Sequence, residues 1–146
     1  MMDEIFTYVR THPQVIVLVF YLAYRVYSGY FAKPQTIEGS RVVQVNSTEQ
    51  LEEELASKEI AVVDFYADWC PPCKTAAPEF AIMSKNLTSI NFLKVNVDAA
   101  KDVAKLHEIK SMPTFKIFVK GKMVQQFTGF NKSQILSKLN ELSRNK

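Results

Sequence analysis

The chain has 146 residues, a length typical of a single domain that is able to bury a core. Its formal net charge of +3 is too small to indicate a nucleic-acid-binding protein. Apolar residues make up 47% of the chain but are unevenly placed, and their densest concentration lies between Val15 and Phe31.

This apolar segment near the N-terminus predicts a helix, which Pro13 can open and Pro34 can close. A transmembrane helix needs about 20 mostly apolar residues, and the stretch 13–31 nearly supplies them if Arg25 reaches an interface. We therefore expect residues 1–32 to be a hydrophobic segment that anchors the chain in a membrane by a single pass.

Three alternatives to an anchor remain open. The first is a secretory signal peptide, which has an apolar run of similar length, although Asp3 and Glu4 weaken the basic start that it requires. The second is a mitochondrial presequence, which the same two acidic residues disfavour. A soluble helix packed on the domain is the third. If the segment is an anchor, Arg10 alone precedes the apolar run, while Arg25, Lys33 and Arg41 follow it. The positive-inside rule then places the rest of the chain in the cytosol.

Residues 33–41 contain Pro34, Gly39 and scattered polar groups, and we expect them to form a linker. After it, strand and helix patterns alternate. The expected strands are 42–45, 60–66, 91–97, 114–120 and 122–128. The expected helices are 48–57, 71–86, 100–107 and one that begins after Asn131. This order predicts an α/β sandwich over residues 42–146, with a central mixed β-sheet flanked by helices.

Two of these helices have capping residues at their starts. Ser47 is followed three residues later by Gln50, which is the spacing of a capping box. Asn131 has the same spacing to Gln134 and is expected to cap the last helix.

The only two cysteines, Cys70 and Cys73, form the motif Cys-Pro-Pro-Cys directly after an apolar strand. If Cys70 is the N-cap of a helix, the three-residue spacing places both thiols on one face. Pro71 and Pro72 then occupy the first two helical positions, where amide hydrogens are not needed. The free amide of Cys73 and the helix dipole favour a thiolate on Cys70. We expect Cys70 to be the attacking thiol and Cys73 the resolving thiol.

The segment 63–74 resembles the active-site segment of the thioredoxin family. Further matches follow in the family's order at Ala77-Pro78-Glu79-Phe80, Lys94-Val95-Asn96-Val97-Asp98, Ser111-Met112-Pro113-Thr114-Phe115 and Phe127-Thr128-Gly129. The resemblance covers about residues 41–144 and departs from the common motif at Pro71, where that family usually has glycine. It implies a thioredoxin fold and a protein-disulfide reductase that cycles through a Cys70–Cys73 disulfide. Its partners would be disulfide-containing target proteins and a thioredoxin reductase or related electron donor.

Asp64 is the only charged residue in the strand expected at 60–66. A lone carboxylate on a buried strand is costly, so burial should raise its pKa toward neutrality. Such a carboxyl can take a proton from Cys73 as that thiol attacks. The resemblance implies this general-base role and suggests Lys94 as the ionic partner. The alternative is a structural aspartate that is hydrogen-bonded to the backbone.

The resemblance also implies a surface around the cysteines that contacts substrates. It places Met112 and Pro113 beside the disulfide, with the backbone of Met112 available to pair with an extended target. Trp69, Pro72 and Gly129 complete this surface. From the residues alone, the single tryptophan could equally belong to the core, and Gly129 could be a turn glycine.

Other kinds of chemistry find little support. Two cysteines with His12 and His107 at unrelated positions do not make a zinc site, and His107 is expected to be a solvated helix residue. No glycine-rich phosphate loop is present, so no nucleotide or flavin cofactor is implied and electrons must come from another protein. Two alternative functions stay open, a thiol oxidase or isomerase in the secretory lumen and a membrane adaptor with the same fold.

Overall fold

The structure is a computed structural model of the chain, and it describes residues 13–31 and 37–144. It divides into two compact units, residues 1–33 and residues 34–146. The first unit contains the helix α2 (Pro13–Phe31), and the second contains a β-sheet with its covering helices.

Helix α2 confirms that the apolar N-terminal segment is helical, but it does not provide the predicted anchor. Within the described ranges, no helix combines the length and the apolar character needed to cross a bilayer. The uncharged run from Val15 to Tyr24 would span about 15 Å as a helix, half of the roughly 30 Å hydrocarbon core, before Arg25 brings a charge. The prediction of a single-pass membrane anchor is therefore wrong. The cytosolic placement of the rest of the chain was derived from that anchor, so it is no longer supported.

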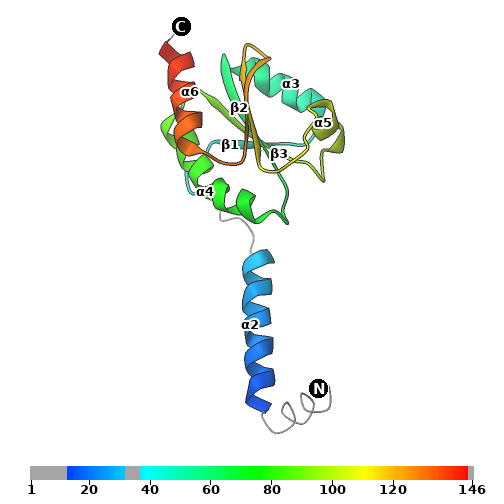
Figure 1. Cartoon of the computed structure of the whole chain (residues 1–146). Helices are drawn as coiled ribbons and strands as arrows, with labels where there is room; N and C mark the ends of the chain where they lie inside the picture. Colours follow the sequence, from blue (N-terminus) through cyan, green and yellow to red (C-terminus); the bar gives the residue numbers. More distant parts are fainter. Residues whose placement is uncertain (1–12, 32–36, 145–146) are drawn as a thin grey trace. The chain divides into compact units, whose positions relative to one another are not determined.

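The second unit is built on a five-stranded mixed sheet (Figure 1). Its strands are β1 (Val42–Val45), β2 (Ile60–Tyr66), β3 (Asn91–Asn96), β4 (Thr114–Val119) and β5 (Lys122–Thr128). They lie in the order β1-β3-β2-β4-β5, with β3 parallel to both β1 and β2. Strand β4 is antiparallel to both β2 and β5. Strand β2 is therefore the central strand of the sheet.

Two pairs of helices cover the two faces of this sheet. The helices are α3 (Thr48–Ser57), α4 (Pro71–Asn86), α5 (Lys101–Leu106) and α6 (Lys132–Arg144). Helices α4 and α6 lie on one face, and α3 and α5 lie on the other (Figure 1). The predicted α/β sandwich is confirmed, and its strands and helices begin and end within one or two residues of the expected positions.

Strand β2 sends alternate side chains into two separate cores, as the period of a strand requires. Val63 is fully buried in the core that contains residues of α3 and α5. Val62 is fully buried in the core on the α4 and α6 side. Asp64 has the same parity as Val62, so its side chain points toward α4. The position of this carboxylate in the fold follows from the alternation of the strand.

His107 is not the solvated helix residue that we expected. It is the C-cap of the short helix α5 and is half-buried. Its ring lies between the rings of Phe65 and Phe118, with centroid distances of 5.5 and 5.7 Å. Burial and the nearby charge of Lys116 lower the pKa of His107. His107 therefore has a packing role on the face of the sheet opposite α4.

The capping box at the start of α3 leads to a stability prediction. The Ser47 side chain accepts a hydrogen bond from the Gln50 amide at 3.2 Å, and the Gln50 side chain accepts one from the Asn46 amide at 2.9 Å. Replacing Ser47 with alanine should lower the free energy of unfolding by about 1 kcal/mol, measured by urea titration. Ser137→Ala, at an exposed site inside α6, is the control and should have little effect. Equal unfolding midpoints for the two variants would contradict this role of Ser47.

Candidate functional site

The site is built at the start of α4, immediately after the central strand. Cys70 is the N-cap residue, and prolines occupy the first two helical positions, as the sequence predicts. The Cys73 amide donates a hydrogen bond to Cys70 Sγ at 3.3 Å. This amide is one of the donors that a helix start leaves without a backbone partner. A thiolate on Cys70 in the reduced chain would therefore lie where both an amide and the helix dipole favour negative charge.

Cys70 and Cys73 form a disulfide, with their Cα atoms 5.3 Å apart. Both residues are almost fully buried, with 4% and 3% of their surface exposed. They pack together with Ala67, and Met112 lies partly buried against them. The two cysteines are close enough to be interconverted between dithiol and disulfide forms, which is the chemistry that the spacing predicts.

Asp64 lies behind Cys73, on the central strand. It is 4% exposed, and its Oδ1 atom has no hydrogen-bond partner. Desolvation raises the pKa of Asp64 to about 7, although the charge of Lys94 opposes this rise. The predicted shift toward neutrality is therefore confirmed, and the alternative of an aspartate satisfied by the backbone does not hold for Oδ1. A buried carboxyl that titrates near pH 7 is suited to exchange protons with a thiol.

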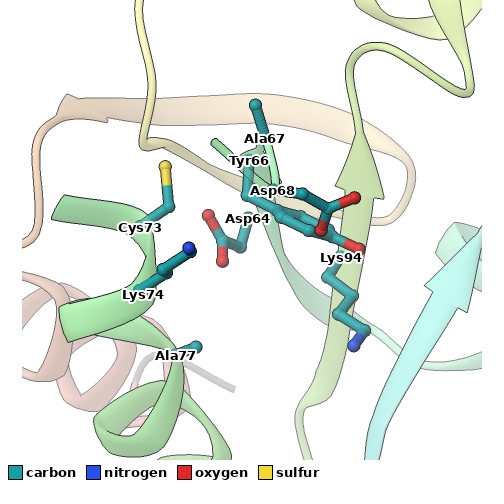
Figure 2. Close-up of a pocket in the computed structure, with 8 residues that line it drawn as sticks. All are labelled: Asp64, Tyr66, Ala67, Asp68, Cys73, Lys74, Ala77 and Lys94. Carbon is teal, nitrogen blue, oxygen red and sulfur yellow. The ribbon is translucent and has the colours of Figure 1, made fainter. Parts of the chain in front are cut away.

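A cavity of about 40 Å³ connects Asp64 with Cys73. Figure 2 shows the two side chains among those that line it, with Lys74 and Ala77 on the side of α4 and Lys94 on the side of β3. A volume of this size is enough for one water molecule. Cys73 and the carboxyl of Asp64 therefore share one small space of the size of a water molecule.

Lys94 is a neighbour of Asp64 but not a direct ion-pair partner. The two residues are paired across the parallel strands β2 and β3. Lys94 Nζ lies 5.7 Å from the ring centre of Tyr66. In the part of the chain that the structure describes, no ion pair within 4.0 Å joins Lys94 to Asp64. Its charge acts on the carboxyl from a distance, which explains why it does not cancel the effect of burial.

Trp69 lies on the surface beside the cysteines, not in the core. It is 52% exposed, and its Nε1 atom donates a hydrogen bond to Asp98 Oδ2 at 2.8 Å. Pro72 is also exposed, one residue before Cys73. An indole held by one hydrogen bond offers a fixed apolar surface to an approaching chain.

The loop before β4 reaches the same place. The peptide bond between Met112 and Pro113 is cis. The Pro113 carbonyl accepts a hydrogen bond from the Gly129 amide at 2.8 Å, so these two predicted residues lie side by side. Gly129 has a φ of +79°, a conformation that glycine adopts without strain. Met112, Trp69 and the disulfide thus belong to one region of the molecule.

The structure adds Asp98, Asp68 and Ala67 to the residues that the sequence singled out. Asp98 holds the indole of Trp69, and Asp68 and Ala67 line the cavity between Asp64 and Cys73. A signal for Asp98 was available, because parallel strands β2 and β3 end at the same edge of the sheet. Among the described residues, no group of three histidine, cysteine or acidic side chains could hold a metal ion.

Comparison with known proteins identifies the family to which this fold and site belong. The thioredoxin family profile matches residues 42–141. Thioredoxin from Ovis aries is 43% identical over 103 residues, which cover 69% of this chain and 98% of the sheep protein. Thioredoxin from Homo sapiens is 43% identical with the same coverage, and that from Mycoplasma pneumoniae is 40% identical over 61% of this chain and 87% of its own length.

Solved structures agree in fold. A thioredoxin from Nicotiana alata superposes with a TM-score of 0.68 at 33% identity, covering 73% of this chain and 96% of its own. The Plasmodium falciparum thioredoxin gives a TM-score of 0.64 at 35% identity, covering 68% and 97%. The sheet, its helices and the Cys70–Cys73 pair are thus those of a thioredoxin-type protein-disulfide reductase. The chain belongs to the thioredoxin family.

Proposed function

We propose that the Cys-Pro-Pro-Cys segment is the active site and reduces target disulfides in two steps. In the first step, the Cys70 thiolate attacks a target disulfide, a Cys70–target bond forms, the target's S–S bond breaks, and one target sulfur leaves as a thiolate. In the second step, Cys73 attacks Cys70, the Cys70–Cys73 bond forms, and the second target sulfur leaves. Two electrons pass from the dithiol to the target. The observation that carries this proposal is the Cys70–Cys73 disulfide at the capped start of α4.

We propose that Asp64 is the general base for the second step. Cys73 must lose its proton before it can attack, and its buried position leaves few acceptors within reach. Asp64 lines the same small cavity as Cys73, and Asp68 is the other carboxyl among the lining residues. Lys94 supports the carboxylate form of Asp64 from a distance. The proton would move from Cys73 to Asp64 as the mixed disulfide is resolved.

We propose that targets bind over the disulfide as extended segments. Trp69 and Pro72 would supply apolar contacts on one side, and Met112 and Pro113 would lie on the other. Gly129, which is hydrogen-bonded to Pro113, would leave room for the target backbone. The oxidised Cys70–Cys73 pair would then be reduced by a thioredoxin reductase or a related electron donor, since the cycle consumes two electrons per target.

A trapping experiment tests the roles of the two cysteines. Cys73→Ser should attack a disulfide-bonded protein such as insulin and stop at a covalent adduct, visible on a non-reducing gel and released by dithiothreitol. Without the second thiol, the adduct has no internal route to resolution.

Cys70→Ser is the matched control and should form no adduct. Failure of Cys73→Ser to trap any target would contradict the proposed reaction. A trapped adduct with Cys70→Ser but not with Cys73→Ser would reverse the assignment of the two thiols.

A further inference from the structure

A second cavity lies behind Asp64, on the side away from the disulfide. Its volume is about 310 Å³. Asp64, Ala77 and Lys94 line both this cavity and the smaller one beside Cys73. The carboxyl of Asp64 therefore lies between the reacting thiol and a larger space, and the hydration of that space bears directly on the carboxyl.

The outer wall of this cavity is a turn, residues 37–40, which precedes the sheet. The Ser40 amide donates a hydrogen bond to the Ile37 carbonyl at 3.0 Å, and Gly39 takes a φ of +75°. The match to the thioredoxin family profile begins only at residue 42. The turn thus lies outside the part of the chain that the family profile matches, and it lines the cavity behind the buried carboxyl.

Arg41, the residue that follows the turn, is fastened to the active-site helix by Ser84. The Arg41 amide donates a hydrogen bond to Ser84 Oγ at 3.0 Å, and Ser84 Oγ donates one to the Ala81 carbonyl at 2.7 Å. Ser84 is 1% exposed, and Ala81 lines the cavity. A buried hydroxyl that both accepts from the segment and donates to the helix fixes their separation.

We propose that the turn 37–40, whose following residue Arg41 is hydrogen-bonded to Ser84 of α4, is a positioning element for proton transfer that forms the outer wall of the cavity behind Asp64 and limits the access of water to its carboxyl. This inference rests on the proposed role of Asp64 as the general base. The turn touches neither the disulfide nor the substrate surface, so it acts only through Asp64. Loosening it would hydrate the carboxylate and lower the pKa of Asp64 from its raised value of about 7.

Charged and titratable groups line the two cavities beside Asp64. They are Lys94 on β3, Lys74 on α4, Tyr66 and Asp68 at the end of β2, and Glu38 in the turn. Removing the Ser84 hydroxyl changes none of these charges. A change in the titration of Asp64 in that variant would therefore report hydration and not a new ion pair.

The test is the titration of Asp64 in the oxidised full-length chain, followed by carbon NMR of the aspartate carboxyls and assigned with Asp64→Asn. Ser84→Ala removes the hydrogen bond to Arg41, and Gly39→Ala loosens the turn independently. A Cβ at residue 39 would lie 3.2 Å from Lys85 Cε and would occupy a positive φ. We expect the Asp64 midpoint to fall by about one pH unit in both variants.

Two control variants make the same kinds of substitution at sites that do not line the cavity. Ser57→Ala removes a hydroxyl that likewise donates to its own helix and accepts from another element. Gly121→Ala strains a positive φ in the β4–β5 hairpin. Both should leave the Asp64 midpoint unchanged.

The outcomes separate this inference from the proposed function. Wild-type midpoints in both Ser84→Ala and Gly39→Ala, or equal shifts in the controls, would overturn the role of the turn while leaving Asp64 as the base. If the midpoints fall but Asp64→Asn resolves mixed disulfides at the wild-type rate, the general-base role fails, and with it the turn's part in proton transfer.

Discussion

Asp64→Asn should slow the resolving step by about 100-fold at pH 7, which is the lower end of the usual contribution of a general base. Asparagine keeps the size of the side chain but cannot accept the proton of Cys73. In the wild-type chain, the carboxylate form of Asp64 is the base. The rate should therefore rise with pH until Asp64 has lost its proton, near its pKa of about 7. The variant should lack this rise.

The measurement is stopped-flow release of a target from a preformed mixed disulfide with Cys70, taken between pH 5 and pH 9. The difference between the variant and wild type should narrow at the alkaline end, where solvent can deprotonate a thiol without help. Glu53→Gln, at an exposed site on α3, is the control and should follow the wild-type profile. Parallel profiles for Asp64→Asn and wild type would remove Asp64 from the mechanism.

The start of α4 shows how much of this site can be predicted from the sequence. Only a short-range argument was needed there, because Pro71 and Pro72 are tolerated in the first turn of a helix and Cys70 directly precedes them. The structure confirms Cys70 as the cap. The burial of Asp64 was also predictable, because helices cover both faces of a central strand. A charged residue within the apolar run of such a strand is therefore buried with its neighbours.

The wrong predictions concern surroundings that local sequence does not encode. His107 follows a short helix with polar neighbours, and its burial depends on Phe65 and Phe118, which are distant in sequence. The composition of residues 33–41 likewise gives no sign that the amide of Arg41, which follows the turn 37–40, is hydrogen-bonded to Ser84, more than forty residues away. In the N-terminal segment, apolar composition was taken for a membrane span, although an uninterrupted length is what a bilayer demands.

The raised pKa of Asp64 also has a consequence for stability. A carboxyl with a folded pKa of about 7 and an ordinary value of 3.8 binds protons more readily in the folded chain than in the unfolded chain. The free energy of unfolding must then fall as the pH rises from about 4 to about 7, because unfolding releases a proton in that window. Above pH 7 the chain bears the full cost of keeping the buried carboxyl ionised. This cost is roughly 4 kcal/mol for a difference of about three units between the folded and the ordinary pKa.

Asp64→Ala removes this carboxyl, so its stability relative to wild type should increase with pH. The gain from pH 4 to pH 8 should approach roughly 4 kcal/mol, measured by urea unfolding of the oxidised chains at each pH. The loss of side-chain volume changes the free energy of unfolding by the same amount at pH 4 and at pH 8. Only the dependence of the difference on pH therefore reports the carboxylate. Glu53→Ala provides the control for an exposed acid. If the curves of Asp64→Ala and wild type run parallel from pH 4 to pH 8, the carboxyl is not held in the desolvated state on which its role as a base depends.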